Sequence, residues 1–271
     1  MIFWLPIGLA LILLLLLLRL RKEQLPLPGI LEYWIFIEGD SIPEEKILIQ
    51  HLVKARAIDG SNMLIFTHIG MHMAMVSRTK NPHLFHPDLY EDDTVSDRLL
   101  PLAAARAPSM VILRFLSNSP VTDQGYLTFM PHLAQAIGEL SGGIAVYDLG
   151  QKRLFSFSEF RENVGKGKEA SRWDAHVRVQ WSPLPFMHAE TMGMQKEGLP
   201  NLETGPMEAD ERMLVMHLLQ EAASTVWKER RIPEFLMIDY FGSQFKIIFE
   251  SMKGNREERK ALVTLLRVEK H

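Results

Sequence analysis

Ser109–Leu116 reads SMVILRFL, and this stretch decides the fold class that the sequence predicts. It is short, dense in apolar and β-branched residues, and follows Pro108, which is the pattern of a buried strand. Strands, amphipathic helices and hairpins alternate on both sides of it, without the regular repetition of a doubly wound parallel sheet. We therefore predict an α+β domain with a mixed or antiparallel sheet and helices packed on it. Ferredoxin-like β-α-β units are one way to arrange these elements.

The sequence before this strand predicts a β-α-β-β unit. Residues 31–38 (LEYWIFIE) are aromatic and β-branched and indicate a strand. A capped amphipathic helix follows over about 41–56, and 62–77 has the pattern of a hairpin. The polar, proline-punctuated residues 80–93 predict a loop, and the Leu- and Ala-rich residues 95–107 predict a helix.

Strands and helices continue to alternate after Ser109–Leu116, with apolar residues at the matching spacing. The predicted elements are a helix over 128–140, a strand over 144–149, a short helix over 157–164, a strand over 177–182, a polar segment over 186–203, a helix from Pro206 to about 229, a hairpin of strands 234–240 and 245–252, and a strand or short helix over 260–268.

The N-terminal residues predict a membrane anchor. No charged residue occurs over 1–18, and 11–18 reads LILLLLLL before the basic residues Arg19, Arg21 and Lys22. An apolar helix of this length is about what a hydrocarbon core of roughly 30 Å requires. A cleaved signal peptide is the alternative, although no basic residue precedes the run and no small-residue cleavage pattern follows it.

This anchor sets the predicted domain organisation. Residues 1–20 form the span and contact the lipid bilayer, 21–30 form a basic, proline-containing linker, and 31–271 form the α+β domain, with a subdivision near 165–172. Basic residues follow the span and none precede it. The positive-inside rule then places the N-terminus outside and the C-terminal domain in the cytoplasm.

Composition excludes several function classes. The net charge is −3, so a broad basic field for nucleic acid is absent. The chain has no cysteine, which excludes a disulfide, a thiolate nucleophile and a zinc–thiolate site. No pattern in the sequence names a cofactor, and we predict none.

Histidines close to carboxylates supply one candidate metal site. His83, His86 and Asp88 lie within the predicted loop 80–93, and imidazole and carboxylate groups together suit zinc or another divalent metal. No H-E-x-x-H pattern accompanies them. The alternative interpretation is a solvated surface loop with an acidic tail.

The segment 188–203 (HAETMGMQKEGLPNLE) supplies the other candidate site. It is polar and glycine-punctuated, yet it carries methionine and leucine residues, as a functional loop on a rigid scaffold can. His188, Glu190 and Glu203 would form an acid/base group there. A structural turn before the next helix is the alternative. The candidate binding residues of the segment are Thr191, Gly193, Met194, Gly198 and Pro200.

The same segment carries a resemblance to the bacterial family called domain of unknown function 4261, over about 109–228. The order of SMVILRFL, LTFMPHLAQAIGEL (127–140), GIAVYDL (143–149) and TMGMQKEGLPNLE (191–203) is similar to that family. The motif departs at Asn201, where an acidic residue is usual, and at Asp148, where Trp is frequent. The resemblance implies an α+β domain and no activity, so it assigns no catalytic residue. The motif positions that match are Thr191, Gly193, Met194, Gly198, Leu199, Pro200, Leu202 and Glu203.

Two functions remain open from the sequence. The first is a membrane-anchored binding or regulatory module whose methionine-containing segment contacts a protein partner. The second is a hydrolase or metal-dependent enzyme that uses either His188, Glu190 and Glu203 or the loop with His83, His86 and Asp88. Because no motif of nucleophilic catalysis is present, the sequence favours the first.

Overall fold

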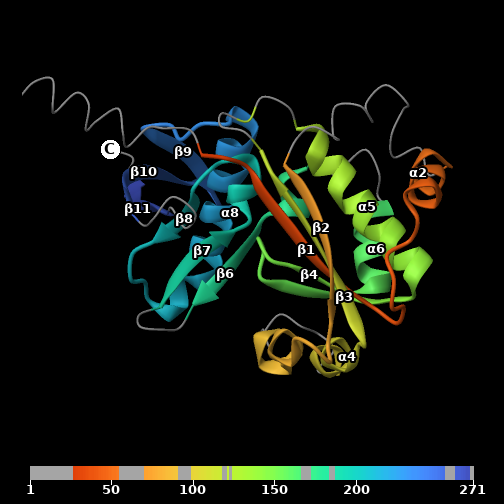
Figure 1. Cartoon of the computed structure of the whole chain (residues 1–271). Helices are drawn as coiled ribbons and strands as arrows, with labels where there is room; N and C mark the ends of the chain where they lie inside the picture. Colours follow the sequence, from red (N-terminus) through yellow and green to blue (C-terminus); the bar gives the residue numbers. More distant parts are fainter. Residues whose placement is uncertain are drawn as a thin grey trace, which may run out of the picture.

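Two β-sheets with helices packed on them make up the protein (Figure 1). The arrangement is that of a computed structural model, and it confirms the predicted α+β class. The residues that the structure describes are 27–54, 70–90, 99–117, 121, 124–165, 172–182, 187–253 and 260–268.

The first sheet, called sheet A, is antiparallel and has the order β2-β3-β1-β4-β5. Helix α2 lies between β1 and β2 in the sequence, α5 lies between β3 and β4, and one strand separates each of these pairs in the sheet. This is the split β-α-β arrangement of ferredoxin-like folds. The bounds are β1 Ile30–Ile37, α2 Glu45–Lys54, β2 Met71–Ser77, β3 Ser109–Leu116, α5 Gly125–Ser141, β4 Gly143–Asp148 and β5 Arg153–Ser156.

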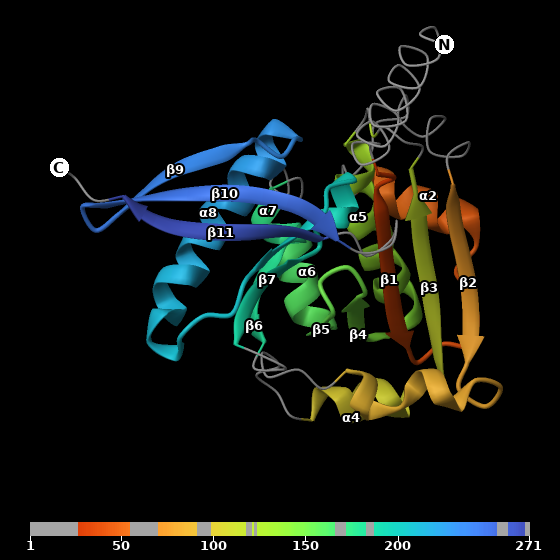
Figure 2. The same ribbon diagram turned by 90° about the vertical axis from the view of Figure 1, so that its left-hand side faces the viewer.

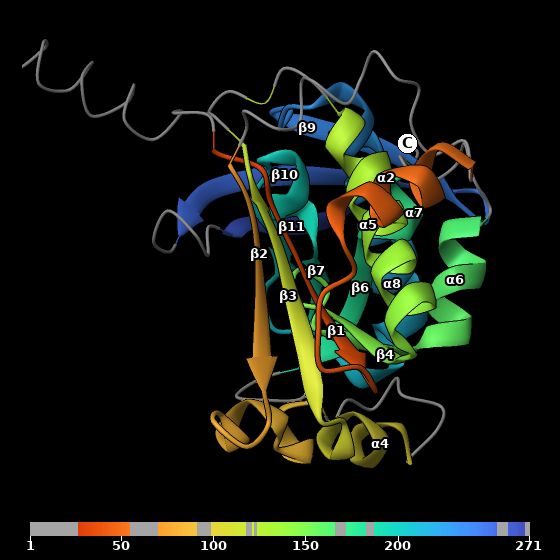
Figure 3. The ribbon, with the colours of Figure 1, turned by 45° about the vertical axis from the view of Figure 1, so that its right-hand side comes forward.

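Helices cover one face of sheet A, short segments cover part of the other, and strand alternation assigns the side chains to each face. Tyr33 and Ile35 of β1 pack with α2 and α5, whereas Phe36 points to the opposite face. There α4 (Leu100–Arg106) and the short turn that ends at Tyr90 close the core. Figure 3 shows α4 at the end of the sheet where β2 ends and β3 begins. The Phe36 and Tyr90 rings meet edge to face with centroids 5.2 Å apart. Burial on both faces explains why β1 and β3 read as nearly continuous apolar runs.

The second sheet, called sheet B, has the order β6-β7-β8-β11-β10-β9. Its pairs are antiparallel except for β8 and β11, which are parallel. Helix α8 packs against this sheet (Figure 2). The long hairpin of β9 and β10 forms one edge of the sheet. The bounds are β6 Arg178–Ser182, β7 His188–Met192, β8 Asn201–Thr204, α8 Arg212–Glu229, β9 Phe235–Tyr240, β10 Ser243–Lys253 and β11 Lys260–Val268.

One cluster of buried side chains joins the two sheets. It contains Ile35 of β1 and Val111 of β3 together with Leu202 of β8 and Val263 of β11. Sheet A ends in the sequence at Ser156 of β5, and sheet B begins at Arg178 of β6. The subdivision near 165–172 stays a prediction. Residues 166–171 themselves lie outside the described residues.

Most predicted elements are confirmed, and three need correction. The predicted strand 109–116 has the bounds of β3, and 260–268 is a strand. The segment 186–203 holds two strands, β7 and β8, joined by the 3-10 turn η4 (Met194–Glu197), and the four-residue β5 was missed. The helix expected from Pro206 begins at Arg212, after another 3-10 turn. Short strands carry little propensity signal, because pairing and burial decide them.

Within the described residues, no helix is both long and apolar enough to span a membrane. Residues 1–20, to which the sequence analysis assigns the span, lie outside the described residues, as does part of the predicted hairpin 62–77. The membrane anchor therefore stays a prediction.

Candidate functional site

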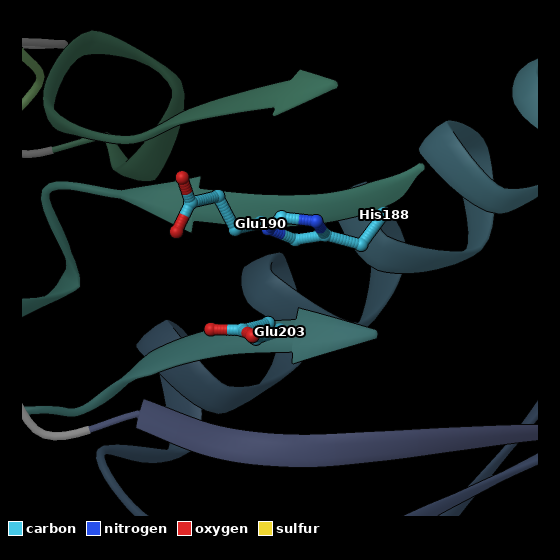
Figure 4. Close-up of side chains that lie close together, drawn as sticks. All are labelled: His188, Glu190 and Glu203. Carbon is cyan, nitrogen blue, oxygen red and sulfur yellow. The ribbon is translucent and has the colours of Figure 1, made fainter. Parts of the chain in front are cut away.

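The structure brings together the three residues predicted as an acid/base group. His188 and Glu190 are two positions apart on β7 and share one face, and Glu203 of β8 is the cross-strand neighbour of Glu190. One ligand atom from each residue lies within 4.8 Å of the others. Figure 4 shows the imidazole and the two carboxylates extending from these neighbouring strands. The set has the donor types of a zinc site.

A lysine already bridges the two carboxylates. Lys260 Nζ of β11 lies 2.6 Å from Glu190 Oε2 and 2.8 Å from Glu203 Oε2, and Gln180 Nε2 donates to Glu190 Oε1 at 2.6 Å. The ammonium therefore occupies the position between the carboxylates that a metal ion would need. No sequence signal pointed to Lys260, because only the parallel pairing of β8 with β11 brings it here.

The electrostatics of this cluster favour an ion pair over a base. Burial alone would raise the pKa of Glu190, but hydrogen bonds from Lys260 and Gln180 outweigh it and hold that pKa below its ordinary value. Burial alone would lower the pKa of Lys260, but the bonds to Glu190 and Glu203 raise it. A carboxylate with a lowered pKa is a weak general base near neutral pH.

The other predicted metal loop does not assemble a ligand set. His86 Nδ1 lies 3.4 Å from Asp88 Oδ2 at the surface, and His83 is also exposed. Within the described residues, only His188, Glu190 and Glu203 form a group of three such ligands. The loop instead contributes Phe85 and Tyr90 to the core beneath α4.

The predicted binding residues of segment 188–203 lie in the interior. Thr191 Oγ1 accepts a hydrogen bond from Leu202 N at 2.7 Å, and the Met194 side chain is fully buried. Gly193 and Gly198 have φ angles of +108° and +71°, which other residues rarely adopt. Pro200 is buried as well. These residue types are explained by the β7–η4–β8 connection, so a surface contact through Met194 is not available.

A pocket of about 390 Å³ opens elsewhere, on the helix-covered face of sheet A. Tyr33 of β1, Asp148 of β4 and Phe155 of β5 form its floor, and Phe160 closes one side. Phe160 belongs to α6 (Phe157–Gly165), and residues of the single turn α7 (Trp173–His176) also line the pocket. Sequence reasoning missed this pocket, although Asp148 was noted as a departure from the family pattern.

The floor of the pocket carries a buried ion pair. Lys196 Nζ, from η4, lies 2.5 Å from Asp148 Oδ2, and Gln151 N donates to Asp148 Oδ1 at 3.0 Å. Tyr33 faces Asp148 across the β1–β4 pair. Burial and the charge of Asp148 raise the pKa of Tyr33 well above its ordinary value, so its hydroxyl remains a donor. Burial also lowers the pKa of Lys196, against the attraction of Asp148.

The rim of the pocket carries two exposed ion pairs. Arg153 donates to Glu159 Oε1 at 2.8 Å, and its guanidinium lies 4.5 Å from the centre of the Phe155 ring. Arg172 Nε donates to Asp174 Oδ1 at 2.9 Å. The hydrogen bond from Arg172 holds the pKa of Asp174 below its ordinary value. The pocket thus joins an aromatic floor to a rim with charges of both signs.

No protein-family model matches the chain, and neither the curated proteins nor the solved structures contain a match. The resemblance to domain of unknown function 4261 therefore stays a prediction.

Proposed function

We propose that this protein is a ligand-binding module, held at a bilayer by a span over residues 1–20, with its folded domain facing the cytoplasm. The observation that carries the binding proposal is the pocket between β4, β5, α6 and α7. Its volume of about 390 Å³ falls within the roughly 300–1,000 Å³ of small-molecule sites. Aromatic walls with a few convergent polar groups are the usual lining of such sites.

The state of the charged groups supports binding over bond-breaking chemistry. Within the described residues that line the pocket, Asp148, Glu159 and Asp174 are each paired with a cation of the chain. Tyr33 keeps its proton, because its pKa is raised well above its ordinary value. These groups can hold and orient a ligand, and none of them is set up to remove a proton near neutral pH.

Ala175 offers a direct test of the pocket, because it lines the pocket and is exposed. Three full-length proteins, the parent chain, Ala175→Trp and the control Glu221→Gln, are prepared in detergent or nanodiscs. Each is screened by thermal unfolding against a library of small polar metabolites. Glu221 is exposed on α8 and does not line the pocket. We expect ligands that stabilise the parent and Glu221→Gln but not Ala175→Trp. A library without any such ligand contradicts the proposal.

The membrane part of the proposal has its own test. Leu14→Arg with Leu15→Arg places two charges in the middle of the apolar run, where each costs about 2.5–3.5 kcal/mol. We expect the parent chain to stay with membranes through alkaline carbonate washing and the double variant to leave them. A parent chain recovered in the wash contradicts the anchor.

One observation favours an alternative, a metal-dependent enzyme. One ligand atom each of His188, Glu190 and Glu203 lies within 4.8 Å of the others, so small side-chain movements would bring these donors around a divalent ion. Binding there requires that Lys260 leave its position between the carboxylates. Zinc titration of the parent chain separates the two functions. The enzyme proposal requires that the unmutated chain, which still carries Lys260, bind one zinc ion per chain.

A further inference from the structure

The charge pattern at the rim of the pocket narrows the ligand class. Arg153 pairs with Glu159 and Arg172 pairs with Asp174, and all four residues line the pocket, so each pair brings one positive and one negative charge to it. On the floor, the charge of Asp148 is balanced by Lys196. The formal charges of these six described residues therefore cancel, and the partly exposed pairs present charges of both signs to solvent.

We infer that the pocket binds a small zwitterion with an apolar portion, of the chemical class of a free amino acid; this inference rests on the proposed function. A carboxylate of the ligand binds to a rim guanidinium, whose planar donors match it in bidentate geometry. An anion alone would displace Glu159 or Asp174 and leave that carboxylate without its cation. A ligand that also carries an ammonium supplies the replacement cation.

Because the rim ion pairs are partly exposed, replacing them with ion pairs to the ligand costs little free energy. The side chains of Arg153 and Glu159 are 35% and 40% exposed, and those of Arg172 and Asp174 are 54% and 42% exposed. Exposed ion pairs are screened by water and contribute little to stability. The new ion pairs between the ligand and these side chains are stronger, because the ligand excludes solvent from them.

The floor supplies the contact for the apolar portion of the ligand. The Tyr33 and Phe160 rings meet edge to face at 5.4 Å, and the Phe155 and Phe160 rings do so at 6.1 Å. Among the described residues, no hydrogen-bond partner of the Tyr33 hydroxyl is found, so this donor is available to the ligand. An amino acid with an aromatic or large aliphatic side chain fills this space, whereas glycine leaves it empty.

Three matched probes test the ligand class on the full chain by isothermal titration calorimetry. L-Phenylalanine carries both charges, 3-phenylpropionate carries only the carboxylate, and phenethylamine carries only the ammonium. We expect L-phenylalanine to bind at least tenfold more tightly than either analogue and than glycine. We expect Arg153→Gln and Arg172→Gln each to weaken it at least tenfold. Lys228→Gln, which removes an exposed charge on α8 outside the pocket, leaves it unchanged.

The outcomes separate this inference from the proposed function. Equal binding of 3-phenylpropionate and L-phenylalanine, blocked by Ala175→Trp, overturns the zwitterion and leaves the pocket as a ligand site. Library ligands blocked by Ala175→Trp, together with no response to L-phenylalanine, leucine or glycine, also overturn the inference alone. If Ala175→Trp blocks no ligand of any kind, the proposed function fails and the inference fails with it.

Discussion

The ammonium of Lys196 lies 2.5 Å from Oδ2 of Asp148, and the two side chains are 0% and 3% exposed. The pair joins η4, between β7 and β8 of sheet B, to the end of β4 in sheet A. Tyr126 of α5 adds a hydrogen bond to the carbonyl of Lys196 at 2.5 Å. Because each charge lacks water, each depends on the other, and the contact fixes the β7–β8 connection against sheet A.

Removing both members of this pair should destabilise the protein by less than the sum of the two single losses. Lys196→Met or Asp148→Asn alone leaves a buried charge or polar group without its partner, and we expect a loss of about 3–5 kcal/mol in the free energy of unfolding. The double variant should lose clearly less than the sum of the two. Urea unfolding followed by tryptophan fluorescence gives the three values, and additive losses would contradict a coupled pair.

Gly193 should tolerate no side chain. Its φ is +108°, and an added Cβ would lie 2.1 Å from the carbonyl oxygen of His176. We expect Gly193→Ala to lower the free energy of unfolding by more than about 1–3 kcal/mol, because strain and a backbone clash combine. Gly205→Ala is the control, because a Cβ there meets nothing within 4 Å. Equal stabilities of the two variants would disprove the turn geometry at Gly193.

The contribution of Lys260 to stability should depend on pH. The pKa of Glu190 in the folded protein is below its ordinary value of 4.5. The stability that the Glu190 carboxylate contributes is therefore fully present above pH 4.5 and is lost as the pH falls through the lower folded-state pKa. The pKa of Lys260 in the folded protein is above its ordinary value of 10.5. The stability that the Lys260 ammonium contributes is therefore fully present below pH 10.5 and is lost as the pH rises through the higher folded-state pKa.

Lys260→Gln measures this contribution. We expect it to cost about 1 kcal/mol at pH 7, since the ammonium is partly exposed and screened. The cost should shrink at pH 3, because the ion pair weakens as the pH falls toward the lowered pKa of Glu190. Parallel urea titrations of parent and variant at both pH values measure the difference in their free energies of unfolding. A difference that is the same at both pH values refutes the ion pair.

The same variant should create a metal site that the parent lacks. Without the ammonium, His188, Glu190 and Glu203 offer one imidazole and two carboxylates, and we expect Lys260→Gln to bind Zn²⁺ at least tenfold more tightly than the parent. Calorimetric titration at pH 7 measures both affinities, with Lys260→Gln/His188→Ala as the control. Tight stoichiometric binding by the parent would instead support the metal-dependent enzyme.

Much of the fold follows from local patterns in the sequence. The apolar runs of β1 and β3 and the amphipathic faces of α2 and α5 are long enough to determine their own class. The connection β7–η4–β8 is different, because Thr191 and Glu190 read as loop residues until Leu202 and Lys260 supply their partners. Short polar strands carry little signal until pairing is known.

The candidate sites divide in the same way. The sequence predicted that His188, Glu190 and Glu203 belong together, because two of them are alternate residues and the third ends the same segment. It did not predict Lys260, which is 57 positions beyond Glu203 and reaches the cluster only because β11 pairs with β8. Nor did it predict the pocket, whose lining comes from six elements between β1 and α7.

The sequence by itself determined the α+β class, the order of the long elements and the exclusion of thiol chemistry, because periodicity and composition are properties of the local chain. Only the tertiary structure decided that Lys196 neutralises Asp148, that Lys260 bridges the candidate acid/base group, and that Arg153 and Arg172 share one opening. Charges act through distance in space, and strand order sets that distance independently of distance along the chain.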